Sequence, residues 1–190
     1  MPSIVDVVGS HRMTWTTGAV TTIAAGDGTA GHILALRNPL ASTRSIRIRT
    51  FEPEFILTTA FGAAQEVGFD AVIARTYTAA HTNGTALTMT GGRSLTAQGT
   101  TVLAGRIASA SALTAGTHTL DTNAVAKGSQ WCSAIGASLA PRLYDFTSNP
   151  LGGIILGADE GFIVRNTILM GATGVGKWHF TLEWDDCVIS

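Results

Sequence analysis

The stretch DEGFIVRNTILMGATGVGKWHFTLEWDDCVIS, residues 159–190, decides the fold of this chain. Its second half alternates apolar and polar side chains with a strict period of two. The apolar set is Trp178, Phe180, Leu182 and Trp184. Successive side chains of a β-strand point to opposite faces, so we expect these four on one buried face. Residues 162–170 are expected to form the partner strand. A glycine-rich loop would join the two strands as a closing hairpin.

Shorter strands are expected along the rest of the chain, separated by turns rich in Gly, Asn and Pro. They fall at residues 33–36, 46–51, 66–77, 85–90, 101–109, 117–120 and 154–156. Pro53 is expected to end the second of them or to mark a sheet edge. Residues 121–150 are expected to be a long insertion or a crossing loop. No amphipathic helix longer than two turns is indicated, and this pattern predicts an all-β, jelly-roll-like antiparallel sandwich.

The N-terminal part has a different composition from the rest. Residues 1–31 are rich in Gly, Ala and Thr, which predicts an extended N-terminal arm or a wrapping strand, with residues 4–8 as a candidate short strand. The β-sandwich domain is expected to cover residues 32–190. Trp15 would then be either an anchor for a neighbouring molecule or a side chain that folds back onto its own domain.

Charge and hydropathy exclude several classes of partner. Only 13% of the 190 residues are charged, the formal net charge is −1, and the densest basic cluster is Arg44, Arg47 and Arg49. Nucleic-acid binding needs far more positive charge on one face, so DNA and RNA are not expected partners. No apolar run approaches the ~18 residues of a membrane-spanning helix and no signal peptide is evident, so we expect no membrane partner and synthesis in the cytoplasm.

One motif in the closing stretch resembles a phosphate-binding loop. Residues 171–177, GATGVGK, match G-x-x-x-x-G-K, but Trp178 follows where Ser or Thr would ligate magnesium. The loop is expected to open a strand, whereas the motif works by opening a helix whose amides hold the phosphates. We therefore expect no nucleotide and no other cofactor, and the glycines are expected to supply positive φ angles in a turn.

The residue types that carry catalysis or bind metals show no useful spacing. The chain has five histidines, His11, His32, His81, His118 and His179, and none forms the His-x-His pair of jelly-roll metalloenzymes. The acidic pairs at 159–160 and 185–186 are expected to be solvated. Cys132 and Cys187 fit no metal spacing and are expected to be free thiols, with one disulfide left open. The sequence thus predicts no catalytic residue, no metal site and no enzyme.

Three stretches carry a resemblance to a known group of proteins. The closing stretch, residues 36–48 with LRNP leading into RSIRI, and residues 69–85 with FDAVIAR and NGT resemble small virion structural proteins of tailed bacteriophages. The resemblance covers residues 32–190. It implies a capsid cement, or decoration, protein with a jelly-roll core, often trimeric on the shell, and without catalytic residues.

The resemblance and the residues together lead to one expected function. The chain would bind and stabilise the outside of the phage head as a homotrimer assembled in the host cytoplasm, with the major capsid protein as partner and the virion as location. The candidate interface residues are Trp15, Arg47 and Arg49. The alternative is a tail or head-fibre domain that binds a host glycan on Trp131, Tyr144 or Trp15. A jelly-roll enzyme is a third alternative.

Overall fold

The protein is a sandwich of two antiparallel sheets, described here from a computed structural model for residues 4–20, 31–89, 93–94, 101–114, 116–132, 138–139, 141–171 and 173–189. The first sheet contains β1 (Ile4–Thr16), β3 (Ser45–Thr59), β6 (Arg93–Ser94), β10 (Ser138–Leu139), β11 (Tyr144–Asp145), β12 (Ile154–Leu156) and β14 (Val175–Ile189). The second contains β2 (His32–Arg37), β4 (Gln65–Ala79), β5 (Thr85–Ala86), β7 (Ala104–Ile107), β8 (Thr117–Leu120), β9 (Ala126–Cys132) and β13 (Gly161–Asn166). Among the described residues there is no helix that could span a membrane.

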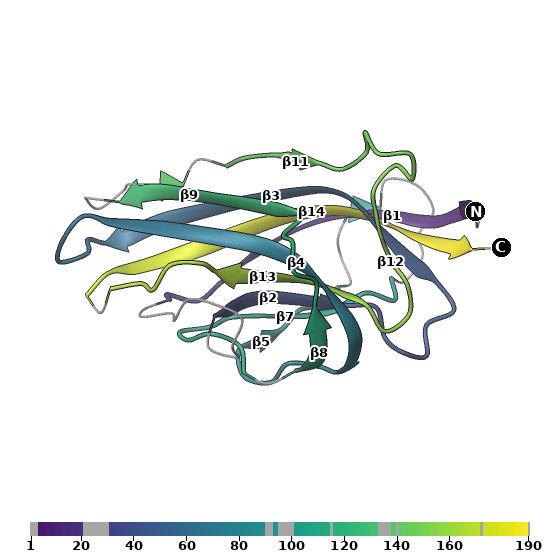
Figure 1. Cartoon of the computed structure of the whole chain (residues 1–190), viewed down its shortest axis with the longest axis horizontal. Helices are drawn as coiled ribbons and strands as arrows, with labels where there is room; N and C mark the ends of the chain where they lie inside the picture. The colour runs from purple at the N-terminus through teal and green to yellow at the C-terminus, as the bar shows by residue number, and fades with distance from the viewer. Residues whose placement is uncertain are drawn as a thin grey trace.

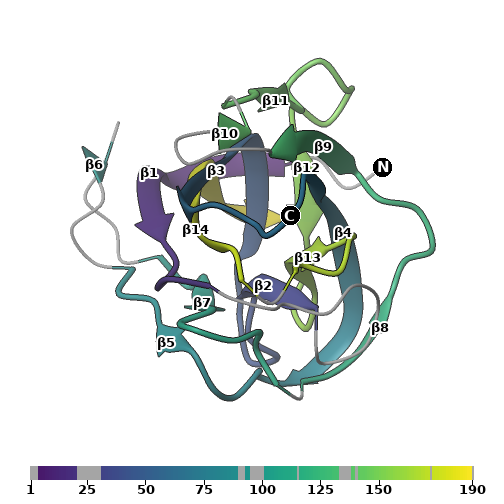
Figure 2. The same cartoon turned by 90° about the vertical axis from the view of Figure 1, so that its left-hand side faces the viewer.

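The strand pairing is that of a jelly roll. Working inward from both ends of the chain, β1 pairs with β14, β2 with β13, β3 with β12 and β4 with β9. Further pairing of β14 with β3 and of β13 with β4 completes two four-stranded layers, β1-β14-β3-β12 and β2-β13-β4-β9. This nested winding is the double Greek key of jelly rolls, and it confirms the predicted fold class. The two layers lie on opposite sides of the core (Figures 1 and 2).

The predicted hairpin between the last two strands is wrong. β13 lies between β2 and β4 in one sheet, whereas β14 lies between β1 and β3 in the other, so the two consecutive strands belong to different sheets. Length explains the choice of neighbours, because β14 spans 15 residues and is matched by β3 with 15 and β1 with 13. The predicted inner face of β14 is confirmed, since all four apolar side chains are 0% exposed.

The first strand corrects the expected N-terminal arm. Residues 4–16 form β1, which runs along β14 from Ile4 opposite Ile189 to Thr16 opposite His179. The side chains of Met13 and Trp15 turn toward the core, so this segment belongs to the sandwich. The sequence indicates a short strand only at residues 4–8, where the register of β1 against β14 is irregular, and the strand continues to Thr16. Residues 21–30 of the predicted arm lie outside the described residues.

Two further strands differ from expectation. β3 continues through Pro53, which lies opposite Phe180 and between the stretches of β3 that pair with β11 and β10. Among the described residues the proline therefore occupies a local edge, where a missing N–H costs no ladder bond. Residues 121–150 are more than a loop, because they contain β9, β10 and β11. The predicted long strand at 66–77 is confirmed as β4.

The protein has one large core and one small one. The large core lies between the sheets and includes tightly packed aromatic rings, such as Phe51 with its centroid 5.1 Å from that of Phe162 across the sandwich. The small core lies on the outer face of the second sheet, because neighbouring residues of β13 and β4 alternate between the two clusters. Its buried members are Ala35, Val72, Ala74, Tyr77, Leu113 and Ile163. Both cysteines are buried and free, as expected.

Candidate functional site

Three of the five histidines meet beside the small core. His32 begins β2, His81 lies in the turn after β4, and His118 lies in β8. One nitrogen of each imidazole lies within 4.8 Å of the others. The ring of His81 is stacked on that of His118 with centroids 5.1 Å apart, and His32 Nδ1 is hydrogen-bonded to His81 Nε2 at 2.6 Å. We call this set the three-histidine cluster.

Burial keeps the imidazoles of the cluster neutral. His32 and His81 are 1% and 2% exposed, and His118 is half-buried. Burial, with a smaller contribution from the neighbouring His118, lowers the pKa of His32 to about 4, and burial followed by repulsion from His32 and His118 lowers the pKa of His81 to about 3. Burial also lowers the pKa of His118. Each imidazole therefore keeps one unprotonated ring nitrogen at neutral pH.

Sequence spacing could not reveal the cluster. His32 and His81 are 49 residues apart, and the fold, rather than a local motif, brings them into contact. The weak signal that existed was the position of each histidine next to a predicted strand or turn. The expectation that no metal site exists rested on spacing along the chain, that is, on the missing His-x-His pair and on cysteines that fit no metal motif.

A small pocket opens beside the cluster. Its volume is about 160 Å³, and its lining includes Tyr77, His81, Arg37 and Arg106. The guanidinium of Arg37 lies 5.7 Å from the ring centroid of Tyr77 and donates to the carbonyl of Thr78 at 3.1 Å. The pocket therefore has a cationic rim next to the imidazole of His81.

The buried neutral histidines predict that the protein loses stability in acid. Their pKa values in the folded state are lowered, so the unfolded chain binds more protons below about pH 6.5 and stability falls as pH decreases. His32 alone contributes a loss of about 3 kcal/mol by the time the pH is below 4, at ~1.4 kcal/mol per unit of pKa. Urea unfolding between pH 7 and pH 4, with a chelator present, measures the slope.

The matched variant for this prediction is His32→Asn, which retains polar groups but cannot titrate. We expect its free energy of unfolding to depend less steeply on pH than that of the wild type. An unchanged slope would show that His32 is already protonated in the folded protein, or that its pKa is the same in the folded and the unfolded chain.

The candidate interface residue Trp15 is buried within its own chain. The residue is 8% exposed, and its ring is stacked on that of Trp184 with centroids 5.9 Å apart. Of the two readings left open by the sequence, the side chain folding back onto its own domain is the one observed. Trp15 therefore offers no surface anchor.

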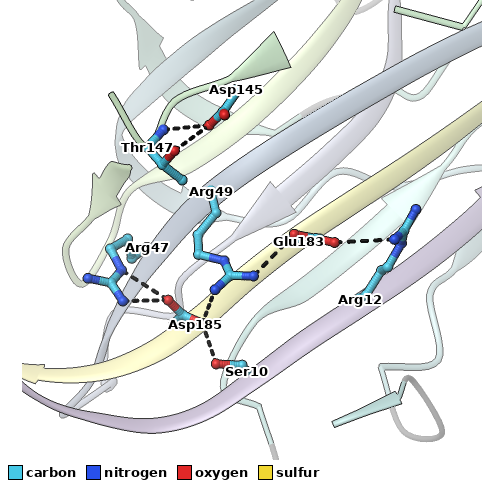
Figure 3. Close-up of polar contacts among 8 residues, drawn as sticks. All are labelled: Ser10, Arg12, Arg47, Arg49, Asp145, Thr147, Glu183 and Asp185. Atoms are coloured by element: carbon cyan, nitrogen blue, oxygen red, sulfur yellow. Dashed lines mark hydrogen bonds and ion pairs between the residues drawn. The ribbon is translucent and has the colours of Figure 1, made fainter. Parts of the chain in front are cut away.

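Arg47 and Arg49 lie on the outer face of β3 and pair with acidic residues of β14 (Figure 3). Arg47 Nε and Nη2 donate to Asp185 Oδ2 at 3.0 and 2.6 Å, and Arg49 Nη2 donates to Glu183 Oε2 at 3.1 Å. Arg12 of β1 reaches the other oxygen of Glu183 at 3.4 Å. The three strands thus share a ladder of ion pairs, with the Arg47 and Arg49 side chains still 21% and 30% exposed.

The expectation that residues 185–186 are solvated is wrong. Both carboxylates are 0% exposed, because each has polar partners in the fold. Ser10 Oγ donates to Asp185 Oδ1 at 2.5 Å, and His11 Nε2 lies 3.1 Å from Asp186 Oδ2. The hydroxyl is thus bonded to a carboxylate and not to the imidazole, so these residues lack the serine–histidine contact that activates a nucleophile.

The loop that resembles a phosphate-binding motif serves packing. It leads into β14 instead of a helix, so its backbone lacks the helix N-terminus that the motif requires. A Cβ on Gly174 would lie 1.9 Å from Phe61, and one on Gly176 would lie 2.0 Å from Phe55. Neither glycine is among the described residues with positive φ, so close approach of aromatic rings, and not turn geometry, is what requires them.

Of the three expected glycan platforms, only Trp131 is exposed. Its side chain is 66% exposed on β9, opposite Glu66 of β4. Tyr144 is tied to its own chain, because its hydroxyl donates to the carbonyl of Lys127 at 2.6 Å and Arg142 lies 5.1 Å from its ring centroid. A groove of about 510 Å³ runs beside this region, lined by Glu66, Phe69, Asp70, Lys127, Gly128, Ser129, Thr167 and Ile168.

These features define the chain as an all-β jelly roll, and comparison with known proteins adds no family. No family model and no curated protein matches it. The structure is similar to VP1 of KI polyomavirus, solved as an unassembled pentamer, with a TM-score of 0.44 and 8% identity over 99% of this chain and 100% of that one. VP2 of infectious bursal disease virus, from a subviral particle, gives a TM-score of 0.16 and 10% identity over 97% of this chain and 43% of that one.

Proposed function

We propose that the protein is a virion structural protein that works by association, as a decoration subunit that binds and stabilises the outside of a phage head as a homotrimer. The proposal is supported by a group of partly exposed apolar and basic side chains beside and on β3. This group combines the partly exposed Arg47 and Arg49 with Leu143 and Leu151, which are 59% and 50% exposed. Large apolar side chains rimmed by arginine are the usual composition of protein–protein interfaces.

These four residues come from β3 and from the segment that pairs with its edge. β11 and β12 pair with β3 at Thr50 and at Arg47, so the segment that holds both leucines borders the arginine-bearing strand. A Cβ on Gly152, next to Leu151, would lie 3.7 Å from Arg47 Nη1. Figure 1 shows β11 running along the outside of β3. We call this set the β3-edge surface.

The distribution of reactive groups supports association over catalysis. Ser10, His11, Asp185 and Asp186 are buried in structural hydrogen bonds. The low share of charged residues leaves surface that is weakly solvated, and such surface favours burial against another protein. The near-neutral net charge fits a protein partner better than packaged nucleic acid.

Native mass measurement and co-sedimentation with empty phage heads test the proposal. We expect a mass of three 19.7 kDa chains and binding to the heads. Leu151→Ser should weaken both, because it places a hydroxyl in the contact. Leu40→Ser is the matched control, since Leu40 is also exposed, at 64%, but lies in the β2–β3 connection. A monomeric protein that stays in the supernatant when the heads are pelleted would contradict the proposal.

A glycan-binding module is the second candidate, favoured by Trp131 and the adjacent groove. An exposed indole beside polar side chains such as Glu66, Lys127 and Ser129 is an arrangement that stacks a sugar ring and bonds its hydroxyls. Glycan-array binding that Trp131→Ala abolishes, without co-sedimentation, would select this function over decoration.

A further inference from the structure

The three-histidine cluster contains buried polar atoms without partners. His32 Nε2 and His118 Nδ1 are both shielded from solvent and have no hydrogen-bond partner. Leaving such an atom unpaired in the interior typically costs about 1–3 kcal/mol. The hydrogen bonds within the fold therefore leave the free-energy cost of these two nitrogens uncompensated. A ligand bound by the imidazoles would account for the arrangement.

A second, independent feature is the support behind His81. The Tyr77 hydroxyl is hydrogen-bonded to His81 Nδ1, and Tyr77 is itself 1% exposed. In metal sites the ligating imidazole is usually held through its other ring nitrogen in this way, which fixes its tautomer and orientation. The Nδ1 atom of His81 is thus held by Tyr77, and its Nε2 atom is directed toward His32.

The backbone around the cluster packs closely against the imidazoles. A Cβ on Gly116 would lie 2.8 Å from His81 Nδ1 and 3.1 Å from His118 Nδ1. The bridge between Thr82 and Thr114 holds the turn that carries His81 against the chain leading to β8. Leu113 N donates to the carbonyl of His32 at 2.9 Å, which fixes the third position. Three separate segments therefore present imidazoles from rigid backbone.

We propose that His32, His81 and His118 bind one divalent transition-metal ion, with zinc as the first candidate. Imidazole nitrogen suits zinc, and three histidines with a water in the fourth position form a known tetrahedral set. The ligands of tetrahedral zinc lie about 3.4 Å apart, given Zn–N bonds of 2.0–2.1 Å. Small rotations of the rings bring nitrogens that lie within 4.8 Å to this spacing.

The bound ion joins the segment after β4 and β8 to β2 on the outer face of the second sheet. This role goes beyond the proposed decoration function and does not depend on it. Zinc binds the folded chain, in which the three ligands converge, more tightly than the unfolded chain, so it raises the midpoint of thermal unfolding.

Zinc titration of the chelator-treated protein tests the site. We expect one zinc per chain after dialysis, a thermal midpoint that rises with zinc and falls again with chelator, and the visible spectrum of a tetrahedral site when cobalt replaces zinc. His118→Ala should abolish stoichiometric binding, because it removes a ligand that is only half-buried and therefore disturbs the core least.

Two variants separate metal binding from simple destabilisation. Tyr77→Phe preserves the ring in the small core but removes the support of His81, so we expect 10- to 100-fold weaker zinc binding in a folded protein. His179→Ala is the control, since His179 contacts Thr16 on the other sheet, and its zinc affinity should be unchanged. Absence of stoichiometric zinc in the wild type, or equal binding by folded His118→Ala protein, would overturn the proposal.

Discussion

Replacing Trp184 with alanine is expected to lower the free energy of unfolding by roughly 3–5 kcal/mol. The side chain is 0% exposed at the centre of the sheet formed by β1, β14 and β3. Its ring is stacked between His11 and Trp15, with centroid distances of 5.1 and 5.9 Å, and its Nε1–H donates to Thr101 Oγ1 at 3.0 Å. Truncation removes both stacking contacts and opens a cavity that the rigid sheets cannot close.

Urea unfolding of the purified variant measures the effect. Trp131→Ala is the matched control, because the same truncation at a side chain that is 66% exposed should change stability by about 0.5 kcal/mol or less. If Trp184→Ala lowered the free energy of unfolding no more than the control, the face of β14 that carries Trp184 would have to be exposed to solvent. The arrangement of the two sheets would then be wrong.

The sequence predicts the face of each strand better than its neighbours. The alternation from Trp178 to Trp184 correctly places four side chains in the core, because the period of two is a local property of the backbone. Pairing is decided by which strands match in length and cover each other's edges, which is a property of the whole chain. β13 and β14 are consecutive and apolar, yet each has two better partners in a different sheet.

Polar residues show the same limit. The sequence does not distinguish the buried Asp185 from an exposed carboxylate, because its partners Ser10 and Arg47 lie 175 and 138 residues away. The three-histidine cluster is hidden for the same reason. β1 is predicted only in part, as a candidate short strand at residues 4–8, because the Gly and Thr content of the segment is also typical of an arm.

Replacing Asp185 with alanine is the second large effect that we expect, a loss of about 3 kcal/mol, at the lower end of what breaking a buried ion pair costs. The Asp185 side chain is 1% exposed and accepts hydrogen bonds from both Arg47 and Ser10. Without it the guanidinium of Arg47 keeps its charge on the sheet but loses the oxygen that accepts both of its hydrogen bonds. Because the Arg47 side chain is 21% exposed, water recovers part of the loss.

A surface pair in the same protein supplies the control. Arg75 and Asp121 are 47% and 38% exposed, so Asp121→Ala should cost only about 0–1 kcal/mol. Adding Arg47→Met to the Asp185 variant should restore part of the stability, because the double variant leaves no unpaired charge. Strictly additive losses in this double-mutant cycle would show that the two side chains do not interact. They would remove the ion-pair ladder as an explanation for how β3 and β14 are held in register on their outer face.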